Sequence, residues 1–221
     1  KGPRYKKADY LELLTMQYQI FRMARTKGML ALEQHVENPH ESIVFQTFPK
    51  FQSDPHALEF MCDYLRLLTL GTDNPHEVEN LMEQELDLHH HEAEQVFHAM
   101  NTFAESYPGL GIVAAVLGII HTMGSITEPP EILGQLIGAA LVGTFAGIWM
   151  CYGFFGPMAG ALKEIREDEH VYFTCMKVGL VSYLQGYAPA VTVEFARKAL
   201  LSHQRPTFAE VEDACGELPP V

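Results

Sequence analysis

The chain has 221 residues, of which 48% are hydrophobic, and its formal net charge is −13 at pH 7. Such an acidic excess argues against nucleic acid as a partner, because phosphates require a basic surface. The four cysteines are widely spaced and form no CxxC pair, so we expect free thiols.

Helical spacing of apolar residues begins early in the chain and predicts a first helix over residues 10–32. Asp54-Pro55 and Asn74-Pro75 each place a capping side chain before a proline, a pattern typical of helix starts. We expect the first of these two helices to end at Gly71. The second is acidic and is expected to run toward Ser106.

Two runs without Asp, Glu, Lys or Arg follow, residues 106–127 and 132–162, which are 22 and 31 residues long. A helix crosses a membrane with about 20 predominantly apolar residues, so both runs are long enough. The connecting residues 128–131 include two prolines and permit only a tight turn. We therefore predict a transmembrane helical hairpin over residues 106–162. A buried hairpin in a soluble protein is the alternative.

Basic residues give the orientation of this hairpin. Lys163 and Arg166 follow the second run directly, whereas the connecting turn has no positive charge. The positive-inside rule places the turn outside and both chain ends in the cytoplasm. Residues 1–105 are then expected to form a cytoplasmic helical domain, and residues 163–221 a cytoplasmic helical segment.

The pattern after the hairpin is again helical. It continues through Val171 and Leu180 until residues 186–189 interrupt it, and another helix is expected over residues 189–202. Thr207 and Glu210 have the spacing of a capping box at the start of a short last helix. Since alternation at period two is not found, we predict an all-α fold.

Small residues four apart recur in both runs and predict close helix packing. They are Gly111/Ala115 and Ala114/Gly118 in the first run, and Gly134/Gly138, Gly143/Gly147 and Gly156/Gly160 in the second. The spacing favours a tightly packed oligomer, although packing of the two helices within one chain explains it as well.

Neither run contains a carboxylate. Ion pathways usually depend on an ionisable group within the membrane, so a partner must supply the acid if this chain serves one. His121 lies within the first run, where its position near the outer end of its helix suits interfacial packing as well as proton relay.

The histidine-rich stretch 89–91, with Glu94 and His98, is a further candidate site. Helical spacing places His90, Glu94 and His98 on one face, which could hold a divalent ion. A second ligand pair does not accompany them, so we expect no metal and no cofactor. Nucleotide loops, nucleophile elbows and HExxH motifs are absent from the sequence, which argues against an enzyme.

Several collinear motifs together resemble the MotA family of flagellar stator proteins over essentially the whole chain. The motifs are Leu32-Glu33, Glu37-Asn38-Pro39, Asp63-Tyr64-Leu65-Arg66, Pro108-Gly109-Leu110-Gly111, Val142-Gly143-Thr144-Phe145, Tyr152-Gly153-Phe154, Gly186-Tyr187-Ala188-Pro189, Val193-Glu194-Phe195 and Arg205-Pro206-Thr207-Phe208.

The resemblance implies a bacterial inner-membrane subunit with four transmembrane helices, of which the two runs are the third and fourth. We expect a preceding hairpin before Lys1. Five such subunits would surround two MotB-type partners, which carry the ion-binding aspartate, and ion flow would turn the ring. The matching rotor-contact positions are Arg25 and Glu33, which would meet the rotor protein FliG. Lipid surrounds the hairpin in this arrangement.

The resemblance also assigns ion-pathway and conformational roles within the hairpin. Pro108 and Pro157 match the family prolines at the cytoplasmic ends of the two helices, although a plain helix boundary explains Pro108 equally well. Thr144 matches a threonine that faces the ion path. Ala115 stands where sodium-type relatives carry threonine, so we expect proton coupling. An ExbB- or TolQ-type energising subunit and a structural membrane scaffold are the alternatives.

Overall fold

The computed structural model describes residues 4–72 and 74–219, and in this part of the chain every regular element is a helix. The all-α prediction is therefore confirmed. Contacts divide the chain into two compact units. The first combines the residues up to His89 with those from Glu167 onward, and the second consists of His90–Arg166.

The first unit is built around α1 (Lys7–Lys27), which packs against the helices around it. Tyr10, Leu13 and Leu14 on α1 are fully buried in the core of this unit. The other helices of the unit are α2 (Leu30–Glu37), α3 (Ile43–Gln46), α4 (Pro49–Gln52), α5 (Pro55–Thr69), α9 (Pro189–Lys198) and α10 (Phe208–Gly216). The first part of α6 (Pro75–Gly124) and the last part of α8 (Gly156–Leu184) complete it.

The three helix starts that the sequence predicts from capping residues are confirmed. The Asp54 side chain accepts a hydrogen bond from the Ala57 amide at 3.3 Å, and Asn74 accepts one from the His76 amide at 3.2 Å. Thr207 and Glu210 form the reciprocal bonds of a capping box at the start of α10. These side chains bind amides that the first turn of a helix leaves without a partner.

The prediction of one helix over residues 10–32 is wrong. α1 ends at Lys27, Gly28 has a φ of +86°, and α2 begins at Leu30. A positive φ ends a right-handed helix, and glycine adopts it without a Cβ clash. The helix expected over 189–202 is also shorter and ends at Lys198.

Pro108 lies inside a helix and does not mark a boundary. α6 runs without interruption from Pro75 to Gly124, past the expected end near Ser106. The interpretation of Pro108 as a plain helix boundary is therefore wrong. A helix tolerates an internal proline where neighbouring groups compensate for the missing hydrogen bond.

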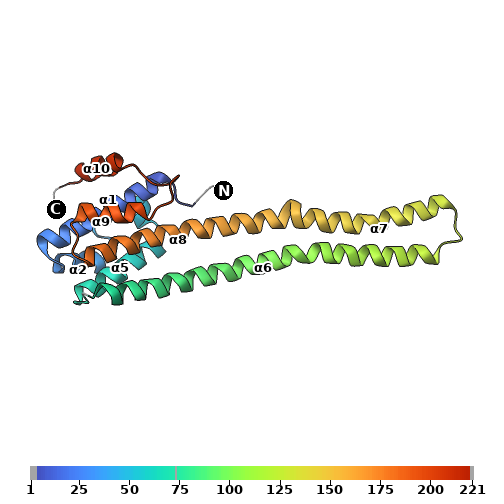
Figure 1. The fold of residues 1–221 in the computed structure, drawn as a ribbon, viewed down its shortest axis with the longest axis horizontal. Helices are drawn as coiled ribbons and strands as arrows, with labels where there is room; N and C mark the ends of the chain where they lie inside the picture. The colour runs from blue at the N-terminus through green and yellow to red at the C-terminus, as the bar shows by residue number, and fades with distance from the viewer. Residues whose placement is uncertain (1–3, 73, 220–221) are drawn as a thin grey trace. The chain divides into compact units, whose positions relative to one another are not determined.

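The second unit contains the helical hairpin. The later part of α6 turns at residues 125–129 into α7 (Pro130–Met150), which continues through a π-helical turn, η1 (Cys151–Phe155), into α8 (Figure 1). α6 and the continuous helical stretch Pro130–Leu184 are both long and apolar enough to cross a membrane. Only 17% and 11% of the apolar 18-residue segments of these two helices are buried. Such burial is low for the core of a soluble protein. The exposed apolar surface favours the membrane hairpin over the soluble alternative.

Candidate functional site

The two helices of the hairpin approach each other through glycine. A Cβ atom added at Gly147 would overlap the carbonyl of Tyr107 and lie 3.1 Å from the Cα of Gly111. One added at Gly111 would lie 2.8 Å from the carbonyl oxygen of Gly143. We call these residues, Gly111 on α6 with Gly143 and Gly147 on α7, the glycine contact. Their small-residue spacing thus serves packing within the chain.

The remaining GxxxG positions do not take part in this packing. A Cβ atom at Gly134, Gly138 or Gly160 would meet nothing within 4 Å. The surface beside the first two is apolar and exposed, including Ile137 and Leu141. The prediction that small residues pack a neighbouring subunit therefore applies to Gly134 and Gly138, which lie beside this surface.

Thr144 and Ala115 lie at the glycine contact. The Thr144 hydroxyl donates a hydrogen bond to the carbonyl oxygen of Gly111 across the two helices, at 3.3 Å. Ala115 is 8% exposed and lies one turn further along α6, on the side that faces Gly143. The structure thus brings the two residues together at one interhelical contact. Their role in an ion path stays a prediction.

Pro157 follows a break in helical register that sequence analysis missed. It is the second residue of α8, directly after the π-helical turn. The cluster of Gly153, Gly156 and Pro157 was the available signal, since glycine and proline weaken an α-helix. Pro108 is half-buried inside α6, and both prolines lie in the second unit.

Arg25 and Glu33 lie on different helices of the first unit. Arg25 is exposed in the last turn of α1, and its guanidinium donates to the Tyr187 carbonyl at 3.2 Å. Glu33 is exposed in the first turn of α2. Each charge opposes the partial charge of its helix end, which stabilises the helices locally. Both side chains are open to a partner, and their rotor contact stays a prediction.

The histidine-rich stretch lies on the exposed surface of α6. His90 and Glu94 form an ion pair at 3.6 Å when the histidine is protonated. Among the described residues, groups of three side chains with the geometry of a metal site are not found. His121 is exposed in the last turn of α6, as expected from its position near the hairpin turn.

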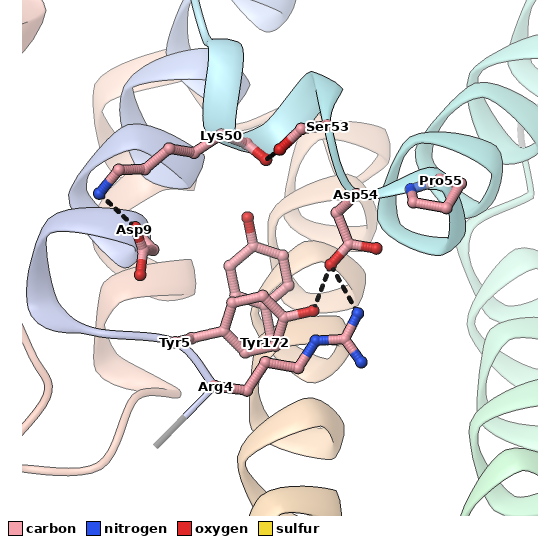
Figure 2. A pocket seen from close by; sticks show the side chains of 8 residues that line it. All are labelled: Arg4, Tyr5, Asp9, Lys50, Ser53, Asp54, Pro55 and Tyr172. Carbon is pink, nitrogen blue, oxygen red and sulfur yellow. Dashed lines mark hydrogen bonds and ion pairs between the residues drawn. The ribbon is translucent and has the colours of Figure 1, made fainter. Parts of the chain in front are cut away.

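A pocket of about 260 Å³ lies in the first unit and is lined mainly by charged and aromatic side chains (Figure 2). Tyr5 stacks on Tyr172 with ring centroids 3.9 Å apart, and its hydroxyl donates to Asp54 at 2.6 Å. Arg4 also binds Asp54, at 3.1 Å, and Lys50 binds Asp9 at 2.7 Å. The charged lining residues thus pair among themselves, which leaves little charge for a ligand.

The pKa values of Asp54 and Tyr5 in this pocket reflect the same pairing. Burial alone would raise the pKa of Asp54, but hydrogen bonds from Tyr5 and from the Ala57 amide, with the Arg4 charge, lower it overall. Burial and the bond to Asp54 raise the pKa of Tyr5. The cluster therefore holds an ionised carboxylate and a neutral phenol, and it anchors the segment before α1 to α5 and α8.

Comparison with known proteins places these features in a family. The profile of the MotA/TolQ/ExbB proton channel family matches residues 54–174. Motility protein A of Escherichia coli (strain K12) is 43% identical over 95% of this chain and 71% of its own length.

Two solved structures share the fold. The structure of the flagellar MotAB stator complex from Bacillus subtilis has a TM-score of 0.68 and 26% identity, and covers 87% of this chain and 66% of that chain. The structure of C. jejuni MotAB has a TM-score of 0.74, with 91% and 70% covered, and at 21% identity it supports the fold alone. By the family match and the extent of similarity to motility protein A, this chain belongs to the MotA/TolQ/ExbB proton channel family.

Proposed function

We propose that this chain is a stator subunit of the bacterial flagellar motor, which forms an ion channel with a MotB-type subunit and converts ion flow into torque. The observation that carries this function is the 43% identity to motility protein A along 95% of the chain. The similarity therefore includes both compact units and extends well beyond the hairpin, which a general membrane scaffold would not require. The role is non-enzymatic.

The hairpin supports a channel that needs a second kind of subunit. Residues 106–127 and 132–162 contain no acidic side chain, whereas ion transfer through a membrane depends on an ionisable group. The MotB-type partner supplies that group in this proposal. Thr144 and Ala115 lie beside the ion path, and Pro108 and Pro157 pass the resulting movement along the helices. Exposed apolar residues and open glycines on α7 face lipid and neighbouring copies in a ring of five.

In this proposal the protein lies in the bacterial inner membrane, with residues 1–105 and 163–221 in the cytoplasm. Lys163 and Arg166 at the end of the second run support this orientation. Arg25 and Glu33 then lie on the cytoplasmic side, exposed and available to charges on the rotor protein FliG. Opposite charges at such a contact steer the two proteins toward each other and contribute to the specificity of their binding.

Motility rescue tests the function. The gene encoding this chain, expressed at full length with its MotB-type partner, is introduced into a flagellated strain that lacks its stator. We expect swimming to be restored with both genes and not with either gene alone. Paralysis despite normal membrane insertion and partner binding would contradict a stator role and favour an ExbB- or TolQ-type subunit.

Proton coupling is expected in the rescued strain. Ala115 offers no side-chain oxygen at the glycine contact, and a hard cation such as Na⁺ requires oxygen ligands. Swimming speed should therefore stay constant when sodium is replaced by potassium at fixed pH, and fall when a protonophore collapses the proton gradient. A speed that follows the sodium concentration would show that the prediction is wrong.

A further inference from the structure

The π-helical turn interrupts the long helix of the hairpin at a defined place. The amide of Gly156 donates to the carbonyl of Cys151, five residues earlier, whereas an α-helix would bond it to Tyr152. One residue is thereby accommodated as a bulge between α7 and α8. Single π-turns of this kind are rare and are frequently found at functional sites.

Gly156 permits the bulge. A Cβ atom at this position would lie 2.9 Å from the Cys151 carbonyl oxygen, which is closer than real side chains approach backbone atoms. An alanine would therefore force the turn to shift. Gly160, one turn further along α8, has nothing within 4 Å of its Cβ position and lacks this constraint.

Pro157 makes the two possible registers nearly equal in hydrogen bonding. In the π register the amide of residue 157 would donate to the Tyr152 carbonyl. Because proline has no amide hydrogen, this hydrogen bond is missing. In an α register the proline would leave the Gly153 carbonyl without a donor instead. The proline therefore removes one backbone hydrogen bond in either register and does not lock the helix into one register.

Aromatic packing against α6 favours the π register. The ring of Phe155 stacks on Tyr107, with centroids 5.0 Å apart and planes 9° apart, and meets the ring of Phe103 edge-on at 5.1 Å. Tyr107 directly precedes Pro108. A change of register would rotate Phe155 and the residues after it by up to about 100°, the angle of one residue, and would separate these rings.

We infer that Cys151–Phe155 is a hinge with two registers, in which Gly156 permits the π register and Phe155 holds it against Tyr107. The inference rests on the proposed stator function and specifies how that function moves the helix. Switching between two discrete packings is the usual way in which small shifts at a site become larger rotations. Gly156 and Phe155 are positioning residues, because they act through the helix and bind no ion.

The test compares Gly156→Ala with Gly160→Ala in the full-length protein, expressed with its MotB-type partner. The torque of single stator units is measured on beads attached to motors, where each unit that joins produces a step in speed. Gly156→Ala units should still join, but torque per unit should fall about tenfold because one register is disfavoured. Gly160→Ala should match wild type. Wild-type torque from Gly156→Ala, or an equal loss with Gly160→Ala, would overturn the inference.

A spectroscopic measurement separates the hinge from the motor function. Trp149 is the only tryptophan of this sequence, and its indole lies 3.4 Å from the Cβ position of Gly153 in the turn. The purified complex, with any other tryptophan replaced by phenylalanine, should show a shifted emission in Gly156→Ala and an unchanged one in Gly160→Ala. Identical emission in both would contradict the hinge, whereas failure of wild type to restore swimming would contradict only the stator function.

A second variant covers the case in which Gly156→Ala fails to accumulate in the membrane. Phe155→Leu keeps both glycines and an apolar side chain but removes the stack on Tyr107. We expect the emission of Trp149 to shift and torque per unit to fall. Wild-type values for both measurements would overturn the inference.

Discussion

Replacing Gly147 by alanine is expected to force the two helices of the hairpin apart and to abolish motility. The added Cβ would overlap the Tyr107 carbonyl and lie 3.1 Å from the Gly111 Cα. Both are backbone atoms, so a flexible side chain cannot move aside to accommodate it. Overpacking of this kind destabilises a protein by about 1–3 kcal/mol. Thr144 would also lose its bond to Gly111, because 3.3 Å is already near the limit for a hydrogen bond.

The effect is measured as the thermal unfolding of the purified full-length complex in detergent, together with membrane abundance and swimming. A loss of 1 kcal/mol shifts Tm by roughly 2–4 °C in a chain of this size. Gly124→Ala is the matched control, because Gly124 lies in the same hairpin, at the end of α6, and its Cβ would meet nothing within 4 Å. Equal Tm values for Gly147→Ala and wild type would show that the close approach is not required.

The sequence predicts those parts of the fold that depend on neighbouring residues. The caps at Asp54, Asn74 and Thr207 bind amides only two or three residues away, so their pattern can be recognised directly. The hairpin is recognisable because a membrane requires a long uncharged run, whatever the helix packs against. Such features need no knowledge of distant contacts.

The sequence does not predict those parts of the fold that depend on distant contacts or on a single backbone angle. Apolar spacing continues through Gly28, so the break between α1 and α2 was hidden although Gly28 is itself a helix terminator. The π-turn is held by Phe155 against Tyr107, a contact that no local pattern reveals. The anchoring of Tyr5 on Tyr172 and Asp54 likewise joins segments far apart in the sequence.

The candidate site shows the same division. The family resemblance identified Thr144, Ala115 and the two prolines as residue positions. The shared location of Thr144 and Ala115 at the glycine contact came from the structure. Spacing alone left open whether the small residues pack within the chain or between copies. Gly143 and Gly147 pack within it, while Gly134 and Gly138 stay open to a neighbour.

Reversal of the charge at Arg25 or Glu33 is expected to stop swimming without unfolding the protein. Both side chains are exposed, and each lies at a helix end where reversal costs about 0.3–1 kcal/mol. Arg25→Glu also loses the bond to the Tyr187 carbonyl, which contributes about 0.5–1.5 kcal/mol. These losses are small beside the roughly 5–15 kcal/mol that stabilises a folded domain. A large loss of motility must therefore come from a lost contact.

Swimming speed and membrane abundance of Arg25→Glu and Glu33→Lys are compared with those of Lys27→Glu in the rescued strain. Lys27 is exposed in the same last turn of α1 as Arg25, so its reversal changes the helix end equally and leaves the proposed rotor contact intact. We expect at least about a tenfold loss of speed for the first two variants, at wild-type abundance, because like charges would then face each other at the rotor. The Lys27→Glu strain should swim. Paralysis of all three would assign the effect to the charge of the helix end, and normal swimming of all three would remove Arg25 and Glu33 from the rotor contact.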